Sequence, residues 1–393
     1  METQVAIVGA GPAGLLLAHL LQRAGIESVV LEARTREYVE QRVRAGVLEQ
    51  GTVDVLTETG VGDRLHREGM VHEGVELRFG GAGHRIDFSR LAGGRAITVY
   101  GQQEVVKDLI AARLEAGGAL HFEAEALDVE AIDGDRPRVR FRAGGSEQEL
   151  RCAVVAGCDG YHGVCRDAIP AGALTVYERD YPFAWLGILA RARPSSEELI
   201  YTHHDRGFAL HSMRSSEVTR NYLQVAPDED LERWPDERIW AELQARMATD
   251  DGFELSTGEI FDKGVTPMRS FVAEPMRFGR LFLAGDAAHI APPTGAKGLN
   301  LAVADVRVLA RGLEAFLARG DESGLDGYSD RCLRRVWRVQ HFSWWMTSML
   351  HRMNADDPFE AKLQRSQLEY VCRSHAAATT LAENYVGLEL EDV

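Results

Sequence analysis

The chain has 393 residues, a formal net charge of −16 and five scattered cysteines without a CxxC pair. This length exceeds what one hydrophobic core ordinarily organises, so we expect two domains or more. The negative charge disfavours nonspecific binding to nucleic acid or anionic membranes, and the cysteine pattern favours reduced thiols in the cytoplasm. We expect neither a signal peptide nor a membrane helix, because the N-terminus lacks a basic segment and no apolar run approaches ~18 residues.

Residues 4–33, "QVAIVGAGPAGLLLAHLLQRAGIESVVLEA", have the pattern of a strand, a glycine-rich turn, a helix and a second strand. This βαβ pattern predicts a parallel sheet. In the turn, Gly9 permits a tight bend, Gly11 lets a pyrophosphate approach the backbone, and Gly14 lets helix and strand pack closely. Glu32 ends the second strand, where a carboxylate can bind a ribose hydroxyl. The segment therefore predicts dinucleotide binding.

The next segments are less regular. In "QRVRAGVLEQGTVDVL", Arg42 and Arg44 precede an expected helix, where they either neutralise phosphates or remain solvated. "LHFEAEALDVEAI" (120–132) and "RVRFRA" (138–143) suggest antiparallel strands. "RCAVVAGCDG" (151–160) predicts a buried strand that ends in another glycine turn.

From about Tyr181 the chain changes to short strands with interleaved polar and aromatic residues, which predicts a second sheet. An exposed helix is expected over residues 235–248, and from Asn300 onwards the pattern is largely helical. We therefore expect a mixed α/β (α+β) fold with a discontinuous Rossmann-like domain. The expected divisions are a Rossmann-like domain of residues 1–72, 98–180 and 268–345, an inserted mixed-sheet substrate domain of residues 73–97 and 181–267, and a helical C-terminal or interface region of residues 346–393.

Two further glycine turns follow apolar strands. "AGCDGYHGVCR" contains Asp159-Gly160, and "LFLAGDAAH" contains Gly285-Asp286. A domain that binds NAD needs neither turn. With GxGxxG, DG and GD present in this order, the chain resembles the flavoprotein monooxygenases that hydroxylate aromatic rings. The resemblance implies FAD as the cofactor.

The same resemblance assigns FAD contacts to the turn "APPTGAKGLN". Asp286 would bind the ribityl chain, and the turn would bring the flavin ring to a helix that begins near Gly298. Backbone N–H groups at a helix N-terminus favour negative charge on the reduced ring. Lys297 either adds positive charge there or is a solvated surface lysine. Further positions implied for FAD are Arg42, Arg44, Gln102, Leu299 and Asn300.

Two polar strands follow the change of pattern. Alternation in "FALHSMR" places Ser212 and Arg214 on one face, and alternation in "TRNYLQV" places Arg220 and Tyr222 together. If these strands pair about residues 215–219, one face carries serine, arginine and tyrosine donors. Such a face is either merely solvated or a clamp for a carboxylate, because an arginine fork matches two carboxylate oxygens.

Longer matches narrow the resemblance to the branch of that family that hydroxylates 4-hydroxybenzoate. The most specific are "PPTGAKGLNLA", "FSWWMTS" and "ENYVGL". The implied product is 3,4-dihydroxybenzoate, made with NADPH or NADH and O2 through a C4a-hydroperoxyflavin. A phenol has a pKa near 10, so forming the reactive phenolate at pH 7 requires roughly 4 kcal/mol of stabilisation.

The resemblance also implies roles in the substrate site. Arg214, with Ser212 and Tyr222, would hold the carboxylate. Tyr201 and Tyr385 would pass the phenol proton towards His72 and on to solvent. The remaining implied positions are Pro293, whose carbonyl would face the substrate ring, and Arg220, which would bias the position of a mobile flavin.

The nicotinamide donor has no second GxGxxG turn, so the resemblance implies that it binds to surface residues: His162, Arg269, Arg34 and Tyr38. Ala33 stands where NADPH users of the family tend to carry a basic residue, which leaves the choice between NADPH and NADH open. A homodimer through the C-terminal helices is implied, and no metal site is expected. A hydroxylase of another phenolic acid and a catalytically silent FAD-binding protein are the alternatives.

Overall fold

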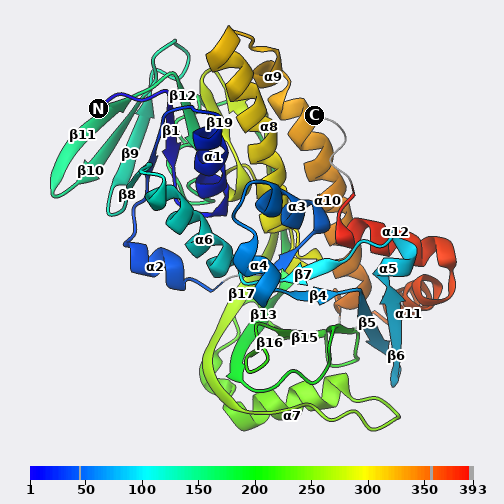
Figure 1. Cartoon of the computed structure of the whole chain (residues 1–393). Helices are drawn as coiled ribbons and strands as arrows, with labels where there is room; N and C mark the ends of the chain where they lie inside the picture. Colours follow the sequence, from blue (N-terminus) through cyan, green and yellow to red (C-terminus); the bar gives the residue numbers. More distant parts are fainter. Residues whose placement is uncertain (44–45, 355–356, 389–393) are drawn as a thin grey trace.

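The computed structural model describes residues 1–43, 46–354 and 357–388. Its upper half in Figure 1 is built on a six-stranded sheet. All neighbouring strands of this sheet run parallel except the β18–β19 pair at one edge. The strand order is β18 (Arg277–Phe278), β19 (Leu281–Leu283), β12 (Val154–Gly157), β1 (Val5–Val8), β2 (Ser28–Leu31) and β8 (Ala119–His121).

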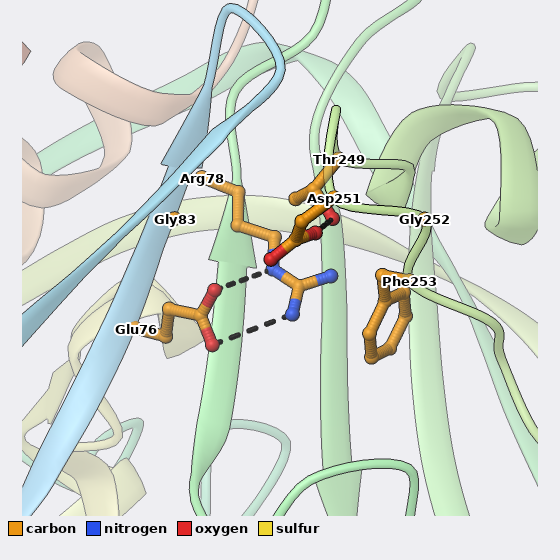
Figure 2. Close-up of a pocket in the computed structure, with 7 residues that line it drawn as sticks. All are labelled: Glu76, Arg78, Gly83, Thr249, Asp251, Gly252 and Phe253. Atoms are coloured by element: carbon orange, nitrogen blue, oxygen red, sulfur yellow. Dashed lines mark hydrogen bonds and ion pairs between the residues drawn. The ribbon is translucent and has the colours of Figure 1, made fainter.

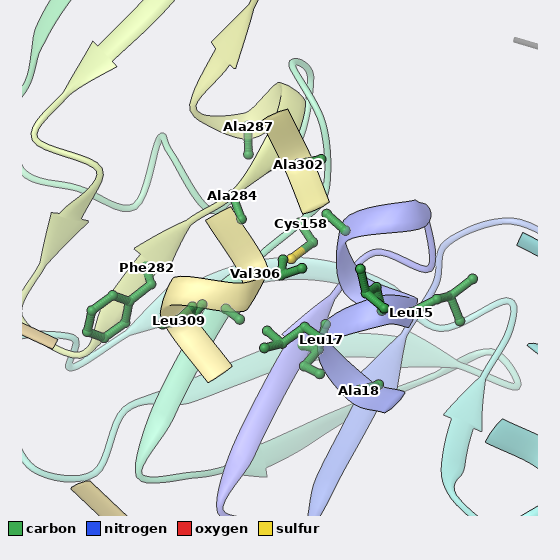
Figure 3. Packing of buried hydrophobic residues seen from close by; sticks show 14 of the residues in the cluster. Leu15, Leu17, Ala18, Cys158, Phe282, Ala284, Ala287, Ala302, Val306 and Leu309 are labelled. Carbon is green, nitrogen blue, oxygen red and sulfur yellow. The ribbon is translucent and has the colours of Figure 1, made fainter. Parts of the chain in front are cut away.

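The central strands are apolar along their whole length because both of their faces are buried, as is usual in parallel sheets. Apolar side chains of α1 (Pro12–Arg23) and α8 (Gly298–Arg319) pack together over the sheet (Figure 3). Pro12 occupies the first turn of α1, where its missing N–H costs little. This arrangement confirms the Rossmann-like start predicted from the sequence.

The second large sheet lies below the first in Figure 1 and has eight strands. Helix α7 (Asp236–Met247) buries Ile239, Leu243 and Met247 in the core cluster beside it and exposes its opposite face. The strand order is β20 (His289–Ile290), β17 (Glu259–Glu274), β13 (Thr175–Arg191), β16 (Thr219–Val225), β15 (Ala209–Met213), β14 (Leu199–Thr202), β5 (Gly74–Phe79) and β6 (Ala82–Asp87).

Two long antiparallel strands, β13 and β17, connect the halves of the molecule. The domain boundaries predicted at 180/181 and 267/268 fall inside these continuous strands. The division into domains stays a prediction, whereas the joining of β5 and β6 to the second sheet agrees with placing residues 73–97 there.

The hairpin of β15 and β16 has the register predicted from the sequence. Ser212 lies opposite Arg220, and Leu210 lies opposite Tyr222. Directly opposed residues of antiparallel strands share a face. The polar face predicted for this hairpin is therefore present.

The remaining named strands form two small three-stranded sheets. The prediction of antiparallel strands over 120–132 is correct only from Glu125, because residues 119–121 form β8 and pair parallel with β2. One small sheet has the order β11 (Ser146–Arg151), β10 (Arg138–Ala143) and β9 (Glu125–Glu130), and the other has the order β3 (Val47–Leu48), β7 (Ile97–Val99) and β4 (Met70–His72).

The C-terminal part is helical, as expected, and α10 (Tyr328–Leu350) runs from the first sheet down to the second (Figure 1). Its end carries Phe342, Met346 and Leu350 into a core shared with the eight-stranded sheet. None of the helices in the described ranges is both long and apolar enough to cross a membrane. The other helical segments are α2 (Arg36–Gln41), α3 (Gln50–Glu58), α4 (Asp63–Glu68), α5 (Phe88–Leu91), α6 (Gln102–Glu115), α9 (Ser323–Asp326), α11 (Pro358–Arg373), α12 (His375–Val386), η1 (Leu231–Arg233), η2 (Gly285–Ala287) and η3 (Pro293–Gly295).

Candidate active site

The predicted turn residues meet at one edge of the parallel sheet. Gly9 follows β1, Glu32 follows β2, Asp159 follows β12, and Gly285-Asp286 follows β19. These strands are parallel neighbours, so their carboxyl ends lie side by side. That edge is where open α/β sheets bind ligands.

The glycines of the first turn have the geometry that their predicted roles require. Gly9 has a φ of +101°, and a Cβ there would lie 2.4 Å from the carbonyl oxygen of Cys158. A Cβ at Gly14 would lie 2.0 Å from the Gly9 carbonyl oxygen, so only glycine permits this helix-to-turn contact. A Cβ at Gly11 would meet no atom within 4 Å. The backbone at Gly11 is therefore open to a ligand, next to the N-terminus of α1.

Hydrogen-bond acceptors surround this opening. The Glu32 carboxylate accepts the N–H groups of Ala10 and Arg34, each at 2.8 Å, which holds it against the glycine turn. Asp159 accepts the Cys165 N–H at 2.9 Å through one oxygen, while its other oxygen is buried and has no hydrogen-bond partner among residues 1–43, 46–354 and 357–388. Burial raises the pKa of the Asp159 carboxyl. Such acceptors fit the hydroxyl groups of a dinucleotide.

The turn of Gly285 and Asp286 is held in place by residues that no sequence pattern singled out. Asp305 on α8 accepts the Gly285 N–H at 3.0 Å and lies 2.7 Å from Nε2 of His289. Burial lowers the pKa of His289, but Asp305, Asp286 and a backbone hydrogen bond together raise it, and the net shift is upward. Asp286 is exposed between buried neighbours, which leaves its carboxylate available at the sheet edge.

In η3 and at the start of α8, some residues are exposed and others are buried within the protein. Pro293 and Gly298 are exposed, and Leu299 is buried. The Asn300 amide accepts hydrogen bonds from the Glu49 N–H and the Thr52 hydroxyl, and donates to the carbonyl groups of Val47 and Ala296. Its side chain is thus fully engaged within the protein, so only its backbone could face a flavin.

Lys297 is 1% exposed, so its interpretation as a solvated surface lysine is wrong. Its Nζ donates to Glu49 at 2.7 Å and to the backbone carbonyl of Tyr385 at 2.9 Å. Arg335 binds the other Glu49 oxygen at 2.7 Å. No local pattern singles out Glu49, because its two cationic partners lie more than two hundred residues away. Gln102, half-buried, begins α6.

Arg214 is a largely buried cation that lacks a carboxylate partner among the described residues. Its Nη1 donates to the Ser212 hydroxyl at 3.0 Å and to the Met213 carbonyl at 2.8 Å, whereas its Nε has no partner. Burial lowers the pKa of the Arg214 guanidinium to about 10, and neighbouring Tyr222 acts in the opposite sense. An uncompensated buried cation is costly unless a ligand supplies the opposite charge.

Tyr201 and Tyr385 are each 1% exposed, and their hydroxyl groups are joined by a hydrogen bond. Burial raises the pKa of both phenols, so both stay protonated and can relay a proton without losing their own. His72 is also buried, and neither of its ring nitrogens has a partner in the described part of the chain. The structure therefore brings the two tyrosines together but forms no direct hydrogen bond from them to His72.

Comparisons with known proteins identify the family. A family model described as FAD binding domain matches residues 2–343. The chain is 49% identical to a p-hydroxybenzoate hydroxylase of Acinetobacter baylyi, over 100% of this chain and 96% of the relative. The chain belongs to the FAD-dependent aromatic hydroxylases. FAD is thus its cofactor, as the three glycine turns and the resemblance predicted.

More distant relatives agree with this assignment. The chain is 31% identical to a 12-dehydrotetracycline 5-monooxygenase/anhydrotetracycline 6-monooxygenase of Streptomyces rimosus, over 81% of this chain and 64% of the relative. The crystal structure of a p-nitrophenol 4-monooxygenase from Pseudomonas putida DLL-E4 superposes with a TM-score of 0.82, over 99% of each chain, at 20% identity. This last likeness concerns the fold, and it confirms the mixed α/β architecture.

The positions predicted for the nicotinamide donor of this hydroxylase fall into two clusters. His162 packs edge-on against Tyr161 at 4.9 Å, and the Arg269 guanidinium lies over the same ring at 4.9 Å. In the second cluster, Arg34 and Arg42 both stack on the half-exposed Tyr38 ring. Arg44 lies outside the described residues. The donor-binding roles stay predictions.

A cavity of about 290 Å³ lies beside β5 and β6 of the eight-stranded sheet and is also lined by the segment after α7 (Figure 2). Its central cation, Arg78, is already bound by Glu76 at 2.7 Å and by the Met247 carbonyl at 2.8 Å. The Asp251 carboxylate accepts the Thr249 hydroxyl. The charged groups of this cavity therefore already have hydrogen-bond partners within the protein. We assign the cavity no catalytic part in the hydroxylase. Within residues 1–43, 46–354 and 357–388, no three His, Cys, Asp or Glu side chains are grouped to hold a metal ion.

The buried histidines predict a loss of stability in acid. Burial lowers the pKa of His72 to about 4 and that of His351 to about 3, from the usual 6.5. Below pH 6.5 these histidines bind protons in the unfolded chain but not in the folded chain, so the free energy of unfolding falls as the pH falls towards 4. The slope should reach at most about 1.4 kcal/mol per pH unit for each histidine. Urea unfolding between pH 7 and 4 checks this, and His72→Asn should flatten the dependence; an equal slope in that variant would contradict the assignment to His72.

Proposed function

We propose that this FAD-dependent hydroxylase converts 4-hydroxybenzoate and O2 into 3,4-dihydroxybenzoate, with NADPH or NADH as the reductant. The observation that carries the proposal is Arg214, a largely buried cation that has no carboxylate partner among the described residues. Arg214 directly follows β15, which pairs with the strand that carries Tyr201, and the Tyr201 hydroxyl is hydrogen-bonded to that of Tyr385 on α12. The name of the relative that is 49% identical supports the same substrate.

The register of the sheet sets the two ends of the substrate apart. Tyr201 lies opposite Leu210, which in turn lies opposite Tyr222, so these residues form one row across three strands. Neighbouring strands are about 4.8 Å apart. A ring placed over Leu210 along this row would have Tyr201 at the end of its hydroxyl group and, at the end of its carboxylate, Tyr222, which neighbours Arg214. A para arrangement of the two groups fits this layout.

Each end of the substrate then has its own chemistry. Arg214 supplies a charged fork, and Ser212 and Tyr222 add hydroxyl donors, which fixes the ring in one orientation. Tyr201 would accept the phenol proton as it donates its own to Tyr385, and Tyr385 would pass its proton on towards His72 and solvent, so negative charge develops on the substrate oxygen. Because phenolate is richer in electrons at the ortho carbon, proton removal activates the position that is hydroxylated.

FAD, once bound and reduced, supplies activated oxygen, and the chain's residues hold and orient it. Gly11 and the α1 N-terminus would receive the pyrophosphate. The exposed Pro293 and Gly298 would border the flavin ring. The other positions proposed for FAD are Gly9, Gly14, Glu32, Arg42, Arg44, Gln102, Asp159, Gly160, Asp286, Lys297, Leu299 and Asn300.

Two features bear on reduction of the flavin. His162 and Arg269 would receive the nicotinamide donor, while Arg34 and Tyr38 would contact its adenosine end. Arg220 lies over the Tyr222 ring at 5.3 Å, opposite Ser212, and so next to the carboxylate clamp. We propose that Arg220 biases the flavin between an inner and an outer position, so that occupancy of the clamp controls when reduction occurs.

The function is tested by incubating purified holoenzyme with NADPH or NADH, O2 and 4-hydroxybenzoate, and by separating the products by chromatography. 3,4-Dihydroxybenzoate is expected. Conversion only of another phenolic acid would favour a sister hydroxylase. A yellow protein that consumes no O2 with any phenolic acid would favour a silent FAD-binding protein.

We also propose that the enzyme is a cytoplasmic homodimer. Its cysteines are free thiols, which suits a reducing compartment. On α11, Phe359, Leu363 and Tyr370 are exposed by 69%, 56% and 57%. Separations of four and seven residues place them on one helix face, and such an apolar stripe suits a second copy of the chain.

Leu363→Glu should therefore shift the protein from dimer to monomer while the FAD content is retained, because the new charge would be buried in the interface. Light scattering after size exclusion measures the mass. Lys362→Glu, one residue away on the helix, is the matched control. An unchanged mass in Leu363→Glu would remove this face from the interface.

A further inference from the structure

The end of α10 touches both halves of the active site. Thr347 lies in its last turn, and His351 follows directly after Leu350. Residues four apart share a helix face. Both side chains are fully buried, and they contact different partners. His351 is hydrogen-bonded to the eight-stranded sheet, and Thr347 is hydrogen-bonded to the turn that contains Pro293.

On the substrate side, Trp185 of β13 donates its indole N–H to Nε2 of His351 at 2.7 Å. The Trp185 ring packs against Tyr222 of the carboxylate clamp at 4.7 Å. The His351 ring also stacks on Phe208 at 4.1 Å, and Phe208 packs near Tyr201. His351 is thus in contact with the aromatic layer behind both ends of the proposed substrate site.

The protonation of His351 follows from its partners. An indole N–H only donates, so Nε2 must be the unprotonated acceptor. Nδ1 lies 3.0 Å from the Thr347 carbonyl, which only accepts, so Nδ1 carries the proton. Burial lowers the pKa of His351 to about 3, and the ring stays neutral in this one tautomer. Both hydrogen bonds therefore persist at neutral pH.

On the flavin side, the Thr347 hydroxyl oxygen lies 2.9 Å from that of Thr294 and 2.7 Å from the Ser343 carbonyl oxygen. The carbonyl takes the Thr347 proton, and the Thr294 hydroxyl then donates to Thr347. Thr294 directly follows Pro293 in η3. A continuous buried chain thus runs from Trp185 through His351 and Thr347 to Thr294.

We propose that this chain, Trp185–His351–Thr347–Thr294, is a positioning device that transmits occupancy of the carboxylate clamp to the turn in front of the flavin. A carboxylate bound by Arg214 and Tyr222 fixes the Tyr222 ring, and the Trp185 ring that packs on it. The hydrogen bonds then fix Thr294 and the adjoining Pro293. The inference rests on the proposed function, because the clamp must bind the substrate for the signal to start.

The test compares two variants that break the chain at opposite ends. Trp185→Phe removes the indole N–H and keeps an aromatic ring, and Thr347→Val removes the hydroxyl and keeps the shape. The measurement is the ratio of flavin reduction rates with and without 4-hydroxybenzoate in anaerobic stopped-flow. In each variant the ratio of reduction rates should fall roughly two- to ten-fold, which is the range that the loss of one hydrogen bond allows. The double variant should lose no more than the larger single loss, since one break already interrupts the chain.

The chain offers matched controls. The indole nitrogen of Trp234 and the hydroxyl of Thr202 are buried without hydrogen-bond partners in the part of the chain that the structure describes, so Trp234→Phe and Thr202→Val delete the same groups where no described hydrogen bond is lost. Thr347→Ser retains the hydroxyl and should retain the ratio. The substrate dissociation constant of each holoenzyme, read from the flavin absorbance change, should vary by less than the ratio does.

The outcomes separate the two proposals. Wild-type ratios in both single variants, or losses that simply multiply in the double variant, would overturn the coupling while hydroxylation by the wild type leaves the function standing. A wild type that makes no hydroxylated product would overturn both.

Discussion

Replacing Arg214 by lysine should weaken 4-hydroxybenzoate binding by about 1.5–3 kcal/mol, which is roughly ten- to hundred-fold in the dissociation constant. Lysine keeps the positive charge but loses the planar fork that meets both carboxylate oxygens. The effect is large because the guanidinium is mostly buried, and its described neighbours provide no competing carboxylate.

The dissociation constant can be read from the perturbation of flavin absorbance on titration with substrate. Arg191→Lys is the matched control, because Arg191 is exposed and pairs with Glu259 at the end of the long strands β13 and β17. FAD content should be unchanged in both variants. Unaltered affinity in Arg214→Lys would show that the carboxylate binds elsewhere.

Replacing Tyr201 by phenylalanine should uncouple the enzyme and largely preserve substrate binding. Without the Tyr201 hydroxyl, the substrate phenol loses its route to Tyr385, so less phenolate forms at neutral pH. Reductant would still be consumed, but hydrogen peroxide would replace much of the hydroxylated product. The fraction hydroxylated should drop several-fold, because the unassisted phenol is only about one part in a thousand ionised at pH 7.

The measurement is the ratio of 3,4-dihydroxybenzoate formed to reductant oxidised. Tyr328→Phe is the control, because Tyr328 is a buried tyrosine whose hydroxyl donates to the Leu283 carbonyl in the six-stranded sheet, whereas the clamp is built around β15 and β16 of the eight-stranded sheet. It should cost stability and leave the ratio unchanged. A wild-type ratio in Tyr201→Phe would remove Tyr201 from the proton route.

Much of the FAD-binding edge could be predicted from the sequence because its rules are local. Gly9 and Gly14 are required by backbone conformation and by contacts within a few residues or with an adjacent strand. Ser212 and Arg214 could be placed on one face because side chains alternate along a strand. The resemblance to a known family then chose between a solvated face and a carboxylate clamp, which alternation alone left open.

Contacts between distant segments depended on the tertiary structure. Lys297 is separated from Glu49 by 248 residues and Tyr201 from Tyr385 by 184. The periodicity of a segment indicates which of its faces is apolar, but not which distant element covers that face. The tyrosine pair was therefore expected only from resemblance, and the burial of Lys297 was missed.

By itself, the sequence determined the parallel sheet, the GxGxxG turn and the polar hairpin, since each depends on backbone geometry and short-range alternation, while the roles of the DG and GD turns came from the family resemblance. Only the tertiary structure decided that Arg214 is largely buried without a carboxylate partner among the described residues, that Glu49 binds Lys297 and Arg335, and that Trp185 meets His351 across 166 residues. These features arise when helices pack on sheets, because burial removes water as an alternative partner and forces each charge or donor to find another.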